Sequence, residues 1–324
     1  IESARARRNP LMGAARTIRI ETGARLHFGL LDTTPPFGGL GVMIDEPSTV
    51  IEICDADRFT VDLDFQSRSL PIAQRLCSLI DRGTLPPVEI RVLQSPPAHC
   101  GFGSGTQLSM AIAEGLSRFL AQDFDQQTLA ARIAARGKRS AVGVHGYFRG
   151  GLIFESGGEA CSSINAITKR LELPEAWCLL LLRPKAQSSA VCGEEERREF
   201  LKLRSDPIAA AHLRTMITDK IIPAAVSGDF ARFVKAIESY NHASGMLFAE
   251  TQGGAYNGPL VTKMIRSLQS RGAVGVGQSS WGPGVFAWCN HPSSARSLAA
   301  SFESTSIHTG IAKVKNQGRC LVDA

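Results

Sequence analysis

The chain has 324 residues, of which 44% are hydrophobic and 20% charged, so it can bury a large core and is neither a fibre nor a disordered tail. Its formal net charge is +6, but the basic residues are spread along the chain, whereas a nucleic-acid-binding protein usually concentrates them on one face. No apolar run approaches the length needed to span a bilayer, and the basic N-terminus lacks the apolar stretch of a signal peptide.

The eight cysteines form no CxxC pair and show no metal-ligand spacing, which favours free thiols in a reducing compartment. We therefore expect a cytoplasmic protein that binds small molecules and has no nucleic-acid or membrane partner. Periodicity predicts a β-rich first half with a glycine turn and helices, then a helix-rich second half. The predicted strands are 17–31, 42–53, 59–63, 88–93, 150–155, 177–183, 273–278, 284–288 and 311–315. The predicted helices are 72–81, 106–120, 126–136, 194–203, 208–227, 230–247, 259–271 and 293–301.

This order of elements predicts an α+β protein with two lobes. We expect a basic flexible arm at 1–16, an N-terminal lobe at 17–165 and a C-terminal lobe at 166–324. The second lobe opens with a strand and ends with a strand-helix-strand pattern, which is typical of an α/β sandwich.

The strongest local signal is a glycine-rich turn before the helix 106–120. Glycines let the backbone approach an anion closely, and the free amides and dipole of a helix N-terminus stabilise negative charge. It is neither a Walker A loop nor a dinucleotide fingerprint, because the spacing differs from both. The alternative is a tight turn that only caps the helix. The residues we predict to bind phosphate here are Gly101, Gly103, Ser104, Gly105, Thr106 and Gln107.

The turn resembles the second motif of the GHMP small-molecule kinase superfamily, and the glycine-rich loop 275–284 resembles the third. Within that superfamily the chain is similar to the β-ribofuranosylaminobenzene 5′-phosphate synthase family, through the stretches 24–32, 38–42, 103–108 and 136–143. The resemblance implies a GHMP-kinase-like two-lobe α+β fold. Its N-terminal lobe would be like domain 2 of ribosomal protein S5, and its C-terminal lobe would be a ferredoxin-like α/β sandwich.

This resemblance implies a glycosyltransferase that condenses 4-aminobenzoate or 4-hydroxybenzoate with phosphoribosyl pyrophosphate in tetrahydromethanopterin biosynthesis. CO2 and pyrophosphate are released, Mg²⁺ is the expected cofactor with no organic cofactor, and a homodimer is the expected assembly. Departure of pyrophosphate leaves an oxocarbenium-like sugar, so the site must stabilise the leaving group without offering a nucleophile. The phosphate turn suits that task, and so does the basic cluster Arg136, Lys138 and Arg139, which we also expect to bind phosphate.

One position separates the chain from many kinases of the superfamily it resembles. Those with a catalytic aspartate carry it in a Ser-Gly-x-Asp stretch shortly before a Gly-Gly pair, and here Gly143 stands in its place. The carboxylate that would accept a proton from an alcohol is therefore missing. An ATP-dependent small-molecule kinase stays the alternative, because some superfamily kinases work without that base. A sensor that binds a phosphorylated ligand without turnover is a third interpretation.

Arg25 and His27 are the main catalytic candidates, because residues two apart on a strand point to the same side. The planar guanidinium of Arg25 can engage a carboxylate or a phosphate with two hydrogen bonds. His99 and His145 lie beside glycine-bearing segments and are further catalytic candidates that could donate to the ring substituent or the sugar. The alternative for each histidine is a structural, half-buried side chain.

The substrate-binding candidates lie in the second half of the chain, where polar residues interrupt a helical pattern and a glycine-rich loop follows. The indole of the loop could stack on a benzoate ring, and the alternative is a hairpin with this indole in the core. The candidates are Asn241, Gln278, Ser279, Ser280 and Trp281. The candidate magnesium carboxylates are Asp32, Asp45 and Glu114, for each of which an exposed, solvated carboxylate is the alternative.

Overall fold

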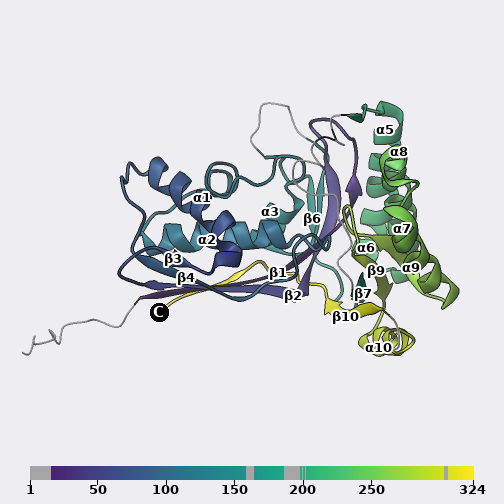
Figure 1. Cartoon of the computed structure of the whole chain (residues 1–324). Helices are drawn as coiled ribbons and strands as arrows, with labels where there is room; N and C mark the ends of the chain where they lie inside the picture. The colour runs from purple at the N-terminus through teal and green to yellow at the C-terminus, as the bar shows by residue number, and fades with distance from the viewer. Residues whose placement is uncertain (1–15, 158–163, 186–197, 199, 201, 303–305) are drawn as a thin grey trace, which may run out of the picture.

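The computed structural model describes residues 16–157, 164–185, 198, 200, 202–302 and 306–324. Two lobes lie side by side (Figure 1): one has a long curved sheet beneath helices, and the other has a smaller sheet flanked by helices. The arm expected at 1–16 lies outside the described residues except for Arg16, which forms an ion pair with Asp323 (2.6 Å). The helix expected at 194–203 also lies mostly outside them.

The first sheet is built on two long antiparallel strands, β1 (Thr17–Leu30) and β2 (Gly39–Asp55). In the first half of β1 alternate residues such as Ile18 and Ile20 are buried against helices, which explains the alternating pattern in the sequence. The further strands are β3 (Thr60–Val61), β4 (Val88–Gln94), β5 (Leu152–Glu155), β6 (Lys169–Leu171) and β11 (Cys320–Asp323). The order is β11-β1-β2-β4-β3, with β5 paired to β2 and β6 to β5.

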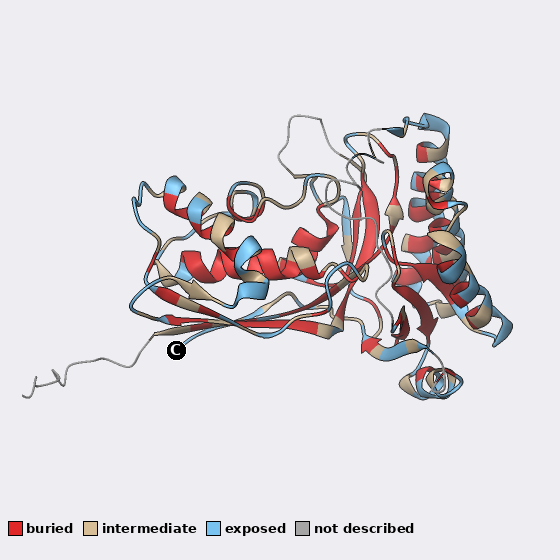
Figure 2. Ribbon diagram, viewed as in Figure 1, coloured by how far each residue is buried: buried red, intermediate tan, exposed pale blue. Residues whose placement is uncertain are grey.

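Helices α1 (Leu63–Leu79), α2 (Ser104–Phe119) and α3 (Val142–Arg149) pack on this sheet. A π-helical turn (Thr128–Ile133) stands where the helix 126–136 was expected. Helix α2 is the central one, and Figure 2 shows it buried along most of its length. Its N-terminus meets the second lobe, because the turn in front of it packs against Ser279. The core therefore fixes where this helix end points.

The second sheet has the order β10-β7-β9-β8, which is the strand order of a ferredoxin-like sandwich. Leu179 and Leu181 face one core cluster, whereas Leu180 and Leu182 face another, so the apolar run of the sequence is a strand buried on both faces. The strands are β7 (Cys178–Pro184), β8 (Val274–Gln278), β9 (Val285–Cys289) and β10 (Ile307–Lys313). The helices are α5 (Pro207–Met216), α6 (Ile222–Ser227), α7 (Phe230–Met246), α8 (Ala249–Gln252), α9 (Gly258–Ser270) and α10 (Pro292–Ala300), with a π-helical segment (Ile217–Ile221) between α5 and α6.

The two lobes are joined where the end of β1 meets α7. The hydroxyl of Tyr240 donates to the Gly29 carbonyl (2.8 Å), and that of Ser244 donates to the Leu30 carbonyl (2.7 Å). Phe28 belongs to a core cluster that also contains residues of β7 and β9. The last residues of β1 are thereby held at the boundary between the two lobes.

The α+β class and the ferredoxin-like second lobe are confirmed, but the sheet pairing departs from a boundary at residue 165. Strands β6 and β11 both belong to the first sheet, although they follow that residue. Helix α3 was not predicted, and the last strand of the second sheet begins at Ile307, earlier than the expected 311–315. Backbone pairing of β6 with β5 and of β11 with β1 decides the placement of these two strands, and local sequence does not encode it.

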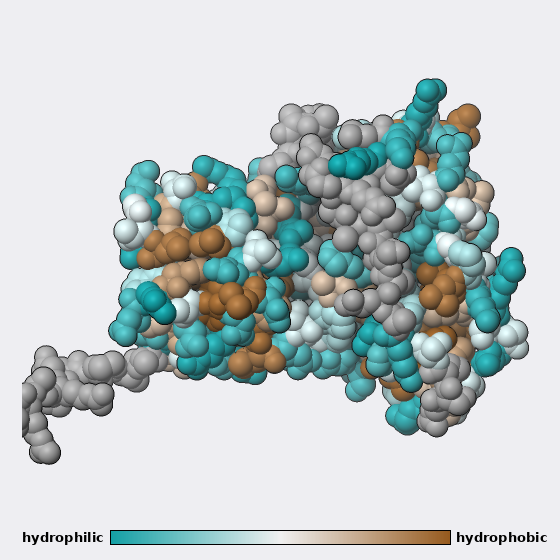
Figure 3. All heavy atoms as spheres, viewed as in Figure 1, coloured by the Kyte–Doolittle hydropathy of each residue, from teal (hydrophilic) through white to brown (hydrophobic). Residues whose placement is uncertain are grey.

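The described residues expose several apolar side chains, such as Leu63 and Ile208. Figure 3 shows a face on which hydrophobic residues gather in separate patches over both lobes, with hydrophilic residues between them. Scattered exposed apolar side chains of this kind are normal for soluble monomers. None of the described helices is long and apolar enough to cross a membrane. The expected homodimer stays a prediction.

Candidate active site

A cavity of about 800 Å³ is lined by side chains from both lobes, and this volume suits a small-molecule site. Its lining, within the part of the chain that the structure describes, contains no aspartate or glutamate. The cavity therefore presents cations, hydroxyls, amides and aromatic rings. The sequence-predicted residues that line it are Arg25, His27, Thr106, Arg136, Lys138, Arg139, Asn241, Gln278, Ser280 and Trp281.

The phosphate turn lies where the lobes meet. Gly103 adopts the left-handed conformation (φ 70°) at the N-cap of α2. Gly101 (φ 82°) packs so closely that a Cβ atom there would lie 2.4 Å from the carbonyl oxygen of Ser279. The buried Ser279 hydroxyl donates to the Gly101 carbonyl (2.6 Å) and accepts from the backbone N–H of His27 (3.0 Å). Ser279 is therefore a positioning residue that holds the turn, and it does not line the cavity.

The start of α2 keeps donors for an anion. Ser104 and Gly105 are its first residues, and no acceptor for their backbone N–H groups is present among the described residues. Thr106, the next residue, is the member of the turn that lines the cavity. Two amides and the positive end of the helix dipole thus point out of the turn. Phosphate binding here stays a prediction.

Gln107 does not bind phosphate, so that part of the prediction is wrong. Its side chain is fully buried, its amide oxygen accepts from the Thr22 hydroxyl (2.8 Å), and its amide nitrogen donates to the Gly143 carbonyl (2.8 Å). Both ends of the amide are therefore used inside the protein. Gln107 instead fixes the backbone at Gly143. This is the position at which the kinases that the chain resembles carry their catalytic aspartate.

Arg25 lies between the phosphate turn and Gly143. Its backbone N–H donates to the Phe102 carbonyl (2.9 Å), and a Cβ atom on Gly103 would lie 3.0 Å from the Cβ of Arg25. A Cβ atom on Gly143 would lie 3.5 Å from Arg25 Nε. The absent acid would therefore stand directly beside this guanidinium, which lines the cavity.

His27 belongs to a hydrogen-bonded chain that ends at a buried carboxylate. Its Nε2 lies 3.0 Å from Ser140 Oγ, and the Ser140 side chain is also hydrogen-bonded to Glu155. Burial, then the charge of Arg25, holds the pKa of His27 well below its usual value, so the imidazole is neutral near pH 7. Both oxygens of Glu155 accept from the Ala141 N–H (3.0 and 2.9 Å), and burial raises the pKa of Glu155 to about 7. This chain can hold a proton near neutral pH.

One wall of the cavity is cationic and the adjoining wall is aromatic. Arg136, Lys138 and Arg139 line the first wall, and their binding of phosphate stays a prediction. The second wall contains Phe200 and Trp281, whose ring centroids are 5.7 Å apart. The guanidinium carbon of Arg139 lies 4.2 Å from the centroid of the Phe200 ring, so the two walls meet at this stacked pair.

The aromatic wall shows where the Trp281 indole lies, which the sequence placed either at a substrate ring or in the core of a hairpin. Phe248 lies 5.5 Å from Phe200 and 5.2 Å from Trp281, measured between ring centroids. Phe37 approaches Phe200 from the first lobe, with its ring centroid 6.3 Å away. Trp281 is half-buried and lines the cavity, so it is not a core residue of a hairpin.

Asn241 and Gln278 line the cavity, but their amides are used by the backbone. Asn241 Nδ2 donates to the carbonyls of Phe28 (2.7 Å) and Gln278 (2.8 Å), and its Oδ1 accepts from the Gln278 N–H (3.0 Å). The Gln278 side chain bonds the Asn257 N–H (2.7 Å) and the Ser280 carbonyl (2.7 Å). They position the loop that carries Trp281, and their contact with substrate stays a prediction.

Two predicted catalytic histidines are not at the cavity. His99 is exposed, in a left-handed conformation (φ 59°), and does not line it. His145 is buried, and both ring nitrogens are occupied, Nδ1 by Gln126 (2.7 Å) and Nε2 by the Asn165 carbonyl (2.7 Å). The structural alternative therefore holds for His145, and its catalytic assignment is wrong.

The candidate metal carboxylates are used elsewhere. Both oxygens of Glu114 pair with the Arg319 guanidinium (2.5 and 2.9 Å), and one also accepts from the Tyr147 hydroxyl (2.7 Å). This carboxylate is fully buried, so neither a metal ligand nor a solvated carboxylate describes it. Asp45 accepts from the Lys313 N–H (2.7 Å), and Asp32 accepts from the Ser205 hydroxyl (2.6 Å). None of the three lines the cavity, so the prediction of Asp45 and Glu114 as magnesium ligands is wrong.

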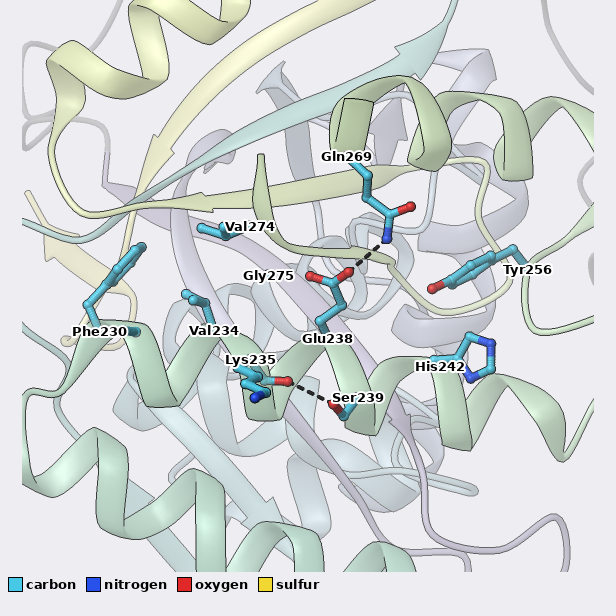
Figure 4. A pocket seen from close by; sticks show the side chains of 11 residues that line it. Phe230, Val234, Lys235, Glu238, Ser239, His242, Tyr256, Gln269, Val274 and Gly275 are labelled. Atoms are coloured by element: carbon cyan, nitrogen blue, oxygen red, sulfur yellow. Dashed lines mark hydrogen bonds between the residues drawn. The ribbon is translucent and has the colours of Figure 1, made fainter. Parts of the chain in front are cut away.

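A second cavity of about 800 Å³ lies on the second lobe, among α7, α9 and β8 (Figure 4). Some of its polar side chains bond to one another or to the backbone: Gln269 Nε2 donates to Glu238 Oε1 (2.7 Å), and the Ser239 hydroxyl donates to the Lys235 carbonyl (2.9 Å). Apolar side chains line one part of it, among them Phe230, Val234 and Val274. Its one lysine lies with a glutamate in the lining, so it is the weaker candidate for a site that handles phosphates.

Sequence reasoning missed Ser140, Glu155, Phe200 and Phe248. Ser140 stands in the stretch 136–143 that carried the family resemblance, which was the one available signal for it. Glu155 ends a short apolar strand, where a buried carboxylate has no local mark. The two phenylalanines read as ordinary apolar positions of helices.

Family models match both lobes. The GHMP kinases N terminal domain matches residues 71–151, and the GHMP kinases C terminal domain matches residues 221–307, together just over half of the chain. The chain is 29% identical over 294 residues to the β-ribofuranosylphenol 5′-phosphate synthase of Methanothermobacter thermautotrophicus, covering 82% of this chain and 87% of that protein. It is 26% identical to the protein of the same name from Archaeoglobus fulgidus, covering 93% and 98%.

Solved structures agree on the fold. The homoserine kinase of Cytophaga hutchinsonii superposes with a TM-score of 0.66 at 15% identity, covering 94% of this chain and 97% of that chain. The mevalonate diphosphate decarboxylase of Enterococcus faecalis does so with a TM-score of 0.66 at 14% identity, covering 96% and 100%. At such identities the likeness shows the fold alone. With the domain matches and the relatives, it follows that the chain belongs to the GHMP kinase superfamily and, within it, to the family of the β-ribofuranosylphenol 5′-phosphate synthases.

Proposed function

We propose that this protein is a pentosyltransferase that condenses an aromatic acid with phosphoribosyl pyrophosphate, with loss of CO2 and pyrophosphate, in tetrahydromethanopterin biosynthesis. The observation that carries the proposal is one cavity in which a cationic wall meets an aromatic wall, at the stacked pair of Arg139 and Phe200. A sugar diphosphate needs the first wall, and a benzoate ring needs the second. Because the relatives are named for a phenol product, 4-hydroxybenzoate is favoured over 4-aminobenzoate.

The reaction balances without an added oxidant. The bond from ribose C1 to the diphosphate breaks, and its electron pair leaves with the diphosphate, which the turn and the cationic wall stabilise. The ring carbon that bears the carboxylate attacks C1. The bond to the carboxylate then breaks, and its electron pair restores aromaticity as CO2 departs. We assign the binding of that carboxylate to Arg25, with the neutral His27 beside it on the same face of β1.

Magnesium enters this proposal with the diphosphate. The described residues include no group of three or more histidine, cysteine, aspartate or glutamate side chains that could hold an ion, and the described cavity lining has no carboxylate. Mg²⁺ is commonly bound through substrate phosphates and water. Its ligands here would therefore be diphosphate oxygens.

The kinase alternative is not favoured, because a carboxylate base is absent both at Gly143 and from the described lining. The test incubates the full chain with Mg²⁺, phosphoribosyl pyrophosphate and carboxyl-labelled 4-hydroxybenzoate, with 4-aminobenzoate in parallel, and follows labelled CO2. Release that requires both substrates supports the synthase. No release with either acid, together with ATP-dependent phosphorylation of a small alcohol, would establish the kinase instead.

A further inference from the structure

Two arginines share one buried hydroxyl beside the phosphate turn. Ser109 Oγ accepts from Arg68 Nη1 (3.2 Å) and from Arg136 Nε (3.2 Å) and Nη2 (3.0 Å), while its own hydroxyl donates to the Gly105 carbonyl (2.8 Å). Arg68 also donates to that carbonyl (3.1 Å). Two guanidinium groups from different elements are thus held against the first turns of α2.

No carboxylate compensates this pair in the described part of the chain. Neither Arg68 nor Arg136 forms an ion pair there, and the pKa of Arg136 is lowered to about 10 by burial and by the charges of Arg68 and Arg75. Burial also lowers the pKa of Arg68. Like charges held together in a partly buried place are unfavourable unless an anion joins them.

The pair lies within reach of an anion held at the helix start. A Cβ atom on Gly105 would lie 3.2 Å from Arg68 Nη1, so glycine at this position leaves room for the guanidinium beside the first turn of α2. Arg136 lines the same cavity as Thr106. Ser109 lies four residues after Gly105, about 6 Å along the helix axis, and Arg68 reaches back to the Gly105 carbonyl. Two adjacent phosphates of one ligand can span that distance.

We propose that Arg68 and Arg136, held by Ser109, bind one phosphate of a diphosphate group whose other phosphate lies on the Ser104 and Gly105 amides. The inference rests on the proposed function, in which this group is the diphosphate of phosphoribosyl pyrophosphate. When the bond to C1 breaks, the added electron pair resides on the diphosphate, and two guanidiniums stabilise it there. Arg68 thus becomes a leaving-group residue that no sequence motif marked.

The test measures pyrophosphate binding to the full chain by calorimetry, with inorganic phosphate as the monophosphate probe. Arg68→Met should weaken pyrophosphate binding at least tenfold and raise the KM for phosphoribosyl pyrophosphate by a similar factor, with the KM for the aromatic acid within threefold. Arg68→Lys, which keeps the charge without the fork, should be intermediate. The matched control is Arg75→Met on the same helix, where the guanidinium Nε donates to the Ile133 carbonyl (2.7 Å); it should bind pyrophosphate like the wild type.

Equal pyrophosphate affinity in the wild type, Arg68→Met and Arg75→Met would overturn the inference, and so would equal wild-type affinities for pyrophosphate and phosphate. The proposed function fails separately. If the wild type releases no CO2 yet binds pyrophosphate through Arg68, the subsite stands and the synthase does not. If CO2 is released while Arg68→Met binds pyrophosphate normally, the synthase stands and the subsite falls. Thermal unfolding of each variant shows whether it is folded.

Discussion

Arg25 Nε lies 3.5 Å from the point that a Cβ atom on Gly143 would occupy. Arg25 comes from β1 and Gly143 from the first turn of α3, and the Gln107 amide holds the Gly143 carbonyl in place. Any carboxylate at position 143 would therefore neutralise the guanidinium assigned to the substrate's own carboxylate. Glycine at position 143 leaves the charge of Arg25 available for the carboxylate of an acidic substrate.

Gly143→Asp should keep the fold and lose affinity for the aromatic acid. The new carboxylate would pair with Arg25, so we expect the KM for the acid to rise by a factor of ten or more, equivalent to at least about 1.4 kcal/mol. Gly143→Ala is the control: its Cβ meets Thr106 Cγ2 at 3.3 Å and adds no charge, so KM should change less than threefold. Equal KM values for the two variants in the CO2-release assay would contradict the role of Arg25.

Trp281→Ala should raise the KM for the aromatic acid, because the indole contributes a wall for the ring. A stacked aromatic pair contributes about 0.5–1.5 kcal/mol beyond buried area, so a roughly three- to tenfold rise is expected. Trp281→Phe retains a ring and should stay near the wild type. The KM for phosphoribosyl pyrophosphate should not follow, since that substrate is assigned to the other wall. A parallel rise in both KM values would show a general distortion of the loop instead.

The sequence predicted what local chemistry determines. Alternation in β1 and the glycine-rich turn at the start of α2 need no tertiary information, and both were correctly located. Helix α3 was not predicted, because two glycines lower its helix propensity. Its packing on β2, with Met43 against Gly146, stabilises it.

Roles that depend on a distant partner could not be predicted. Gln107 and His145 read as functional because polar side chains beside a motif invite that interpretation, yet their partners Thr22 and Asn165 come from other segments. Glu155 is the converse case, because only the folded chain places it beside Ser140. In each case a hydrogen bond between remote segments decides the role, and pattern and propensity carry no information about it.

Glu155 should make stability depend on pH. Its folded-state pKa is raised to about 7 from 4.5, so its contribution to the unfolding free energy is full below pH 4.5 and is lost as the pH rises through 7. The loss is on the order of 3 kcal/mol. Glu155→Gln cannot ionise, so the difference in unfolding free energy between wild type and variant should shrink or reverse from pH 5 to pH 8 in urea titrations. If the unfolding free energies of the two proteins change in parallel with pH, the pKa of Glu155 is not raised.

Glu114→Ala should unfold easily without changing the magnesium requirement. Its removal leaves the Tyr147 hydroxyl and the Arg319 guanidinium without their carboxylate, and breaking a buried ion pair costs about 3–5 kcal/mol. Glu172→Ala is the control, because its ion pair with Arg170 leaves the carboxylate side chain 67% exposed and should contribute at most about 1 kcal/mol. Urea unfolding measures both losses, and a Mg²⁺ titration of CO2 release on folded protein measures the metal requirement. If the Glu114 variant alone needs more Mg²⁺ for CO2 release, Glu114 contributes to metal binding despite the contacts that bury it.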